Sequence, residues 1–194
     1  MKDKITIKKT EILSDDYYTL KKVTYHYQKP DGSYETQVRE VYDRGHGAAI
    51  LLYNRHKASV ILTRQFRLPT FINPYEDGML IESCAGMLDD ENPENCIRRE
   101  AQEETGYQVE KVTKVFEAYT SPGVLTEKLH FFVAEYNKDM KVGEGGGLDE
   151  EQEHIEVIEL KFNEALKMIY RGDIKDAKTI LLLQYAKIHE LVSV

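Results

Sequence analysis

Four glutamates, Glu91, Glu100, Glu103 and Glu104, lie close together in the middle of the chain. On a helix over residues 93–105, Glu100 and Glu104 lie one turn apart on one side, and Glu103 lies beside both. Like charges at this spacing repel each other, so the cluster is unfavourable unless a cation sits among the carboxylates. Oxygen ligands of this kind suit Mg²⁺ or Mn²⁺ better than Zn²⁺. A divalent metal would offset this repulsion, and a solvated charged helix face is the alternative.

Sequence signals at both ends define the helix that must hold these glutamates. Asn92 can act as the N-cap, Pro93 suits the first helical position, and Gly106 suits a left-handed residue after the last turn. Within the helix, Arg99 can partly neutralise Glu103 one turn away. We therefore expect a helix over residues 93–105 in which Glu100 and Glu104 are the more available ligands.

The rest of the chain mixes strand and helix patterns without regular alternation. Strand-like runs occur at residues 48–53, 59–66, 79–84, 112–119, 128–136 and 154–160. Apolar spacing within residues 165–188 predicts two closing helices. The glycine-rich segment 138–152, which ends in a run of acids, is expected to be a mobile loop and not a strand. These patterns indicate an α+β fold with a mixed sheet.

The N-terminal segment alternates apolar and polar residues, with Val23, Tyr25 and Tyr27 on one side, and it contains a turn sequence at residues 29–33. This pattern predicts two or three antiparallel strands. A hairpin of about 43 residues cannot bury a core alone, so it must pack on the rest of the chain or on a second subunit. We expect a β appendage over residues 1–43, a main domain over residues 44–194, and a homodimer.

The composition argues against several classes of partner. The 194 residues include 26 Lys plus Arg against 34 Asp plus Glu, and the net charge of -8 has the wrong sign for a phosphate backbone. No apolar run approaches the ~18 residues that span a bilayer, and the N-terminus lacks a signal-peptide pattern. We therefore expect a cytoplasmic protein that binds neither nucleic acid nor a membrane.

Residues 86–107 resemble the box motif of the Nudix family, G-x5-E-x7-R-E-U-x-E-E-x-G-U, in which U is aliphatic or aromatic. The chain reads REAQEETGY over residues 99–107. One departure is that four residues, not five, separate Gly86 from Glu91. Outside the box, RQFR at residues 64–67 and Pro122 resemble segments of the ADP-ribose and nucleotide-sugar pyrophosphatases of this family. Segments 42–44 and 81–86 and the glycine-rich acidic loop are most similar to the branch that acts on GDP-mannose.

The resemblance implies a fold and a reaction. The fold is an α/β/α sandwich with a mixed sheet, and the reaction is Mg²⁺-dependent hydrolysis of GDP-mannose to GMP and mannose 1-phosphate. ADP-ribose or another nucleotide sugar is the alternative substrate. A nucleotide-binding sensor without catalysis is a third possibility, which the intact glutamates disfavour.

The resemblance also implies roles for individual residues. It places Mg²⁺ on the Ala85 carbonyl, Glu100, Glu104 and a loop carboxylate, either Glu153 or Glu151. It favours Glu151 as general base, with Glu103 second. The substrate contacts that it implies, several of them in the N-terminal strands, are Tyr17, Val38, Arg39, Glu40, Arg67, Ala85, Gly86, Met87, Glu104, Glu127 and Lys178.

Guanidinium groups pair bidentately with phosphate oxygens, which suits Arg39 and Arg67 to substrate binding. Surface ion pairs are the alternative role for these two arginines. For Tyr17, stacking on the guanine and packing within the hairpin or dimer seam are both open.

Overall fold

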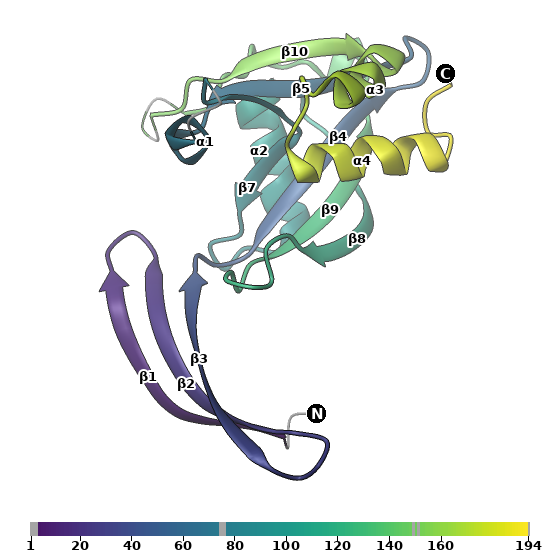
Figure 1. Ribbon diagram of the computed structural model, residues 1–194. Coiled ribbons are helices and arrows are strands. Elements are labelled where there is room, and N and C mark those ends of the chain that lie inside the picture. Colours follow the sequence, from purple (N-terminus) through teal and green to yellow (C-terminus); the bar gives the residue numbers. More distant parts are fainter. Residues whose placement is uncertain (1–3, 74–76, 149, 151, 194) are drawn as a thin grey trace. The chain divides into compact units, whose positions relative to one another are not determined.

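The computed structural model describes residues 4–73, 77–148, 150 and 152–193 (Figure 1). The chain divides into two compact units, one made of Met1–His46 with Tyr119–Lys128 and the other of Gly47–Ala118 with Leu129–Val194. Within the described residues, no helix is long and apolar enough to cross a membrane.

The first unit is built on a three-stranded antiparallel sheet in the order β1-β2-β3. Its strands are β1 (Ile5–Asp15), β2 (Thr19–Gln28) and β3 (Tyr34–Asp43). The predicted N-terminal strands are thereby confirmed. None of the described residues between 4 and 46 is buried, so the sheet has no core of its own in the single chain.

One face of this sheet is the more apolar. Tyr27 pairs with Ile5, Tyr25 with Ile7, and Val23 with Thr10. Cross-strand partners share a face, so the alternating pattern in β2 is matched by isoleucines of β1. Ile5 and Ile7 are exposed, with exposed fractions of 39% and 56%.

Residues 119–128, which we expected in the main domain, join the first unit at the end of β3. The Tyr42 N–H donates to the Val124 carbonyl (2.8 Å), and the Thr126 N–H donates to the Tyr42 carbonyl (3.1 Å). This pairing is long-range, so local sequence patterns do not reveal it.

The second unit contains a seven-stranded mixed sheet in the order β10-β5-β4-β9-β8, with β6 paired to β5 and β7 paired to β4. β4 and β9 are parallel, whereas β5 is antiparallel to β4, β6 and β10. The strands are β4 (Gly47–Asn54), β5 (Ser59–Phe66), β6 (Met79–Glu82), β7 (Cys84–Met87), β8 (Thr113–Tyr119), β9 (Lys128–Glu135) and β10 (Glu156–Lys161). The mixed sheet expected from the sequence is confirmed.

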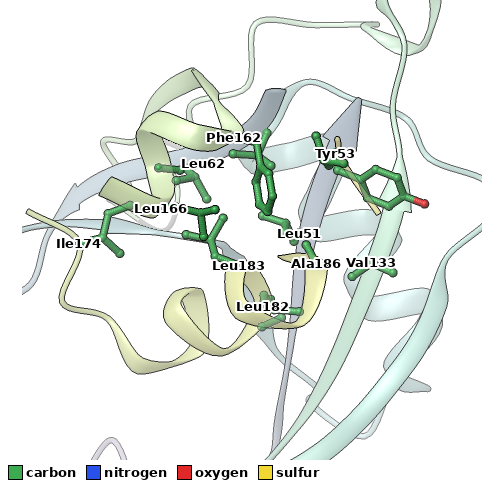
Figure 2. Packing of buried hydrophobic residues seen from close by; sticks show 14 of the residues in the cluster. Leu51, Tyr53, Leu62, Val133, Phe162, Leu166, Ile174, Leu182, Leu183 and Ala186 are labelled. Carbon is green, nitrogen blue, oxygen red and sulfur yellow. The ribbon is translucent and has the colours of Figure 1, made fainter. Parts of the chain in front are cut away.

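Helices cover both faces of this sheet, which makes the unit an α/β/α sandwich (Figure 1). They are α2 (Pro93–Thr105), α3 (Phe162–Arg171) and α4 (Ala177–Ile188). Even-numbered residues 48–52 of β4 pack with Ile97 and Ala101 of α2. Odd-numbered residues 49–53 pack with α3 and α4, and Figure 2 shows Leu51 and Tyr53 in this second cluster. Burial on both faces explains why β4 is continuously apolar.

Two short helices and a strand break were not predicted. The helices are α1 (Leu68–Ile72) and the 3₁₀-helix η2 (Lys138–Met140). The run at residues 79–84, expected as one strand, is divided at Ser83, where the chain leaves β5 and pairs with β4. The Ser83 N–H donates to Thr179 Oγ1 of α4 (2.6 Å). Hydrophobic periodicity cannot show such a change of partner.

Candidate active site

Helix α2 begins and ends where its sequence signals predict. The Asn92 side chain accepts from the Glu94 N–H (2.9 Å) at the N-cap. Gly106 is left-handed, with φ 76°, and its N–H donates to the Gln102 carbonyl (2.9 Å). This satisfies backbone groups that a helix end otherwise leaves unpaired. The predicted carrier of the glutamates is confirmed.

The short loop before α2 is closed by a tight turn. The Glu91 N–H donates to the Leu88 carbonyl (2.5 Å), and the two residues between them are left-handed, with φ 40° at Asp89 and 69° at Asp90. Aspartate tolerates this conformation better than most residues. The loop between Gly86 and Glu91, one residue shorter than in the family motif, is thus closed by this turn. The shortening does not alter α2, which follows it.

Glu104 is the most deeply buried of the glutamates, with 2% of its surface exposed. Among the described residues, its Oε2 atom has no hydrogen-bond partner. Burial raises the pKa of Glu104 to about 8; the Cys84 thiol lowers it, and the charges of Glu100 and Glu153 raise it further. A buried carboxylate oxygen without a donor is the kind of group that a cation would satisfy.

Glu100 lies beside it, with 14% of its side chain exposed. Burial raises the pKa of Glu100 to about 7, against the attraction of Arg99. Strand β7 passes so close that a Cβ on Gly86 would overlap the Glu100 carboxylate. The absence of a side chain at Gly86 therefore makes the space for this carboxylate. Hard oxygen donors and an orphaned buried oxygen fit Mg²⁺ or Mn²⁺.

Arg99 is the cation that pairs with the remaining glutamates of the cluster. Its guanidinium contacts Glu100 Oε1 (2.8 Å), Glu103 Oε2 (2.6 Å) and Glu91 Oε2 (3.5 Å). We expected Arg99 to neutralise Glu103 and leave Glu100 available; instead it binds both, because one guanidinium presents several donors. Among the described residues, no group of three acidic, histidine or cysteine side chains is arranged to hold a metal ion by itself.

The glycine-rich loop after η2 is tied to the end of α2. Gly146 N–H donates to the Glu104 carbonyl (2.9 Å), and Gly147 N–H donates to the Glu103 carbonyl (3.2 Å). A Cβ on Gly145 would lie 2.5 Å from the Glu104 carbonyl oxygen. We expected these glycines to allow loop closure; in the structure they allow close approach to the helix and satisfy its last carbonyls.

The same loop brings Glu153 to the site. Its negative charge contributes to the raised pKa of Glu100 and of Glu104. Its Oε2 atom accepts from the Leu148 N–H (3.2 Å). Glu151, the other candidate from this loop, lies outside the described residues.

A second group of charges, all in the same unit, contains Arg67 and Lys178. Both cations bind Glu82, which is 2% exposed: Arg67 Nη2 lies 2.8 Å from its Oε2, and Lys178 Nζ lies 3.0 Å from the same oxygen. Burial acts to raise the pKa of Glu82, but the two cations lower it overall. We predicted no role for Glu82 from the sequence. The feature that could have indicated one is a single carboxylate directly after the apolar run Met79–Ile81.

Two predicted substrate residues of the first unit, Tyr17 and Glu127, differ greatly in exposure. Tyr17 lies between β1 and β2 with 84% of its surface exposed, and its ring packs edge-on against Tyr18 (4.8 Å). Glu127 is only 6% exposed, and its Oε1 lies 3.4 Å from Arg44 Nε. Tyr17 is thus available to stack on a planar group, whereas Glu127 is already paired.

The three predicted residues of β3 do not share a face. Arg39 pairs with Val23, whereas its neighbours Val38 and Glu40 pair with Thr24 and Lys22. Successive side chains of a strand alternate, so Arg39 lies on one face and the other two lie on the opposite face. Arg39 itself donates to the Val38 carbonyl (2.8 Å) and to Gln37 Oε1 (3.1 Å).

Comparison with solved structures supports the fold. The chain aligns with a protein described as "Crystal structure of ADP compounds hydrolase", with a TM-score of 0.72 and 18% sequence identity over 96% of each chain. At this identity the likeness concerns the architecture alone.

Comparison with families and curated sequences goes further. Residues 4–42 match the "GDP-mannose pyrophosphatase NudK N-terminal domain" and residues 43–183 match the "NUDIX domain". The chain is 55% identical to a GDP-mannose pyrophosphatase of Yersinia enterocolitica over 99% of its length and 100% of the relative. It is 54% identical to that of Cronobacter sakazakii over 95% of both chains and 53% identical to that of Escherichia coli O157:H7 over 99% of this chain and 100% of the relative. The chain therefore belongs to the Nudix hydrolase family.

Proposed function

We propose that the protein hydrolyses the diphosphate bond of GDP-mannose to give GMP and mannose 1-phosphate, with Mg²⁺ as the cofactor and Mn²⁺ as a substitute. The observation that carries this proposal is the buried Glu104, whose Oε2 has no hydrogen-bond partner among the described residues, beside the half-buried Glu100. The near full-length similarity to GDP-mannose pyrophosphatases supports the choice of substrate.

In this proposal the Ala85 carbonyl, Glu100, Glu104 and Glu153 hold the metal. When bound, Mg²⁺ would neutralise phosphate charge and acidify a water. Arg67, Gly86, Met87 and Lys178 bind the diphosphate end of the substrate. Arg67 is suited to this because 41% of its side chain is exposed and a guanidinium fits phosphate oxygens.

The general base in this proposal is Glu151, with Glu103 as the second candidate. The Arg99 ion pair of Glu103 supports this order, because Glu103 must weaken that 2.6 Å contact before it can take a proton from water. Replacing each with Gln separates the two: loss of turnover in Glu151→Gln, with activity retained in Glu103→Gln, is the expected pattern.

The N-terminal unit supplies the remaining proposed contacts, namely Tyr17, Val38, Arg39, Glu40 and Glu127. We also propose a homodimer, in which a second copy of the chain covers the apolar face formed by Ile5, Ile7, Val23, Tyr25 and Tyr27. Support comes from the absence of buried residues among described positions 4–46, because a sheet without buried residues gains little of the hydrophobic stabilisation that drives folding.

A phosphate-release assay over a panel of nucleotide sugars, with Mg²⁺ and with EDTA, tests the function. We expect the highest kcat/KM with GDP-mannose and negligible turnover with EDTA. Preference for ADP-ribose would instead identify an ADP-sugar enzyme. No turnover of any diphosphate substrate would indicate a nucleotide-binding sensor, and undiminished turnover in EDTA would refute the metal assignment.

A further inference from the structure

We propose that Glu82 is a positioning residue that orients Arg67 and Lys178 toward the diphosphate of the substrate. The inference rests on the proposed function and assigns a role to a residue outside the box motif. Glu82 is the last residue of β6, and only 3% of its side chain is exposed. It therefore cannot reach a substrate itself and must act through the two cations that it binds.

The contact with Arg67 fixes one edge of the guanidinium. Arg67 Nε donates to Glu82 Oε1 (3.2 Å) and Nη2 donates to Glu82 Oε2 (2.8 Å), so both carboxylate oxygens are used. Within the described part of the chain, no hydrogen bond joins Nη1 to another group. This two-point contact orients the planar group and leaves its other edge for a phosphate.

The contact with Lys178 fixes the second cation. Lys178 Nζ lies between Glu82 Oε2 (3.0 Å) and Asp176 Oδ1 (2.9 Å), with 13% of its side chain exposed. Asp176 is itself held as the N-cap of α4, where it accepts from the Thr179 N–H (2.9 Å). An ammonium has three donors, so Lys178 keeps one for a ligand.

The strand break at Ser83 joins this assembly to the metal ligands. Glu82 ends β6, and two residues later Ala85 lies in β7 beside Gly86. The Thr179 hydroxyl that receives the Ser83 N–H belongs to the same α4 turn as Lys178. The positive charge of Arg67 also acts to lower the pKa of Glu104. Glu82 and its two cations are thus linked through Ser83 and the first turn of α4 to strand β7, which carries Ala85 and Gly86.

Energetics favour a functional reason for burying this carboxylate. A buried ion pair is often no more stabilising than apolar residues of similar volume, because both charges lose their hydration. The preceding residues 79–81 are apolar, so an apolar side chain at 82 would suit the strand. The presence of a buried carboxylate at position 82 is explained if its loss of hydration is offset by a function. That function is to hold two cations in a fixed arrangement for an anionic substrate.

The test is the kinetics of Glu82→Gln with GDP-mannose and Mg²⁺. Gln keeps the shape but loses the charge, and its amide nitrogen cannot accept from Arg67 or Lys178. We expect KM to rise about tenfold or more and kcat to change less than about threefold, because ground-state and transition-state binding weaken together. Glu82→Asp, which retains the charge, should recover part of the lost affinity.

Two controls separate positioning from general stability. Glu159 also accepts from a lysine and a buried tyrosine, Lys57 (2.9 Å) and Tyr136 (2.8 Å), so Glu159→Gln should lower stability without changing KM. In an Arg67→Ala background, Glu82→Gln should add much less to KM than in the wild type, because one of the cations through which it acts is gone.

A KM in Glu82→Gln that rises no more than in Glu159→Gln, or an effect that is fully additive with Arg67→Ala, would overturn the role. If Glu82→Gln does not fold, Glu82→Asp must still raise KM or the proposal is wrong. Calorimetric titration with inorganic pyrophosphate and Mg²⁺ provides a readout independent of turnover. Wild-type protein that binds pyrophosphate tenfold tighter than Glu82→Gln but hydrolyses no nucleotide sugar would refute the proposed function and support the positioning role.

Discussion

At the scale of single residues, the carboxylates of the site differ in whether a cationic side chain pairs with them. Arg99 binds Glu100 and Glu103, and Arg67 and Lys178 bind Glu82. Among the described residues, the buried Oε2 of Glu104 has no hydrogen-bond partner. Glu82, Glu100 and Glu103 therefore each have a cationic partner in the folded chain. The site presents one buried position where additional positive charge would be stabilising.

Glu104→Gln should lower kcat by at least about 100-fold with little change in fold, because it removes a proposed metal ligand that no neighbouring group replaces. Turnover assays and circular dichroism measure the two effects. Glu144→Gln is the matched control, since Glu144 is 94% exposed and pairs only with Lys141 (2.9 Å) in the described structure. A Glu104→Gln enzyme with wild-type kcat would exclude the metal assignment.

The stability of metal-free protein should depend on Glu104 and on pH. The pKa values of Glu104, about 8, and Glu100, about 7, lie above the ordinary 4.5, so the folded state holds these protons more tightly than the unfolded state. Their contribution is fully present below pH 4.5 and is lost as pH rises through 8.

In EDTA, the melting temperature of Glu104→Gln relative to wild type should therefore increase between about pH 5 and about pH 9. Mg²⁺ should raise the melting temperature of the wild type most at the high end of this range, because metal replaces the proton. A difference between variant and wild type that is constant across pH would contradict the role of Glu104 burial.

At the scale of elements, helix α2 and the glycine-rich loop bound to its C-terminal end form one structural unit of the site. The helix holds Glu100 and Glu104, and the glycines of the loop bind the last carbonyls of the helix and lead to Glu153. Backbone geometry, not side-chain chemistry, makes this possible, because Gly145 has φ 75° and no room for a Cβ.

Gly145→Ala should lift the loop from α2, lower stability by at least about 1–2 kcal/mol and reduce kcat. Gly143→Ala is the matched control, because a Cβ there meets nothing within 4 Å. Thermal melts and steady-state kinetics of the pair provide the comparison. Equal effects of the two substitutions would show that the loop does not need this close approach.

At the scale of the whole molecule, the two units differ in how they bury apolar surface. The second unit has a core on each face of its sheet, whereas the described residues 4–46 of the first unit contain no buried residue. This imbalance is the reason to propose that a second copy completes the first unit.

Light scattering should give a mass of twice 22.5 kDa for the intact protein. Ile7→Lys, on the apolar face, should shift the mass to that of one chain and lower the melting temperature. Thr36→Lys is the control, since Thr36 pairs with His26 on the opposite face and is exposed. A wild-type protein that remains monomeric at high concentration would refute the dimer.

The sequence by itself determined the elements whose signals are local. Asn92, Pro93 and Gly106 define α2, and the spacing of Glu100 and Glu104 places both on one side of it. Caps and helical spacing operate within a few residues, so they can be read without knowing the rest of the fold.

Only the tertiary structure decided which distant groups meet. Arg67, Glu82 and Lys178 come from three elements, and nothing in their local sequence indicates that two cations share one buried carboxylate. The same is true of the division at Ser83 and of the glycine loop on α2, since both depend on pairing between segments far apart in the chain. Long-range contacts depend on how whole elements pack, and a local pattern of residue types does not contain that information.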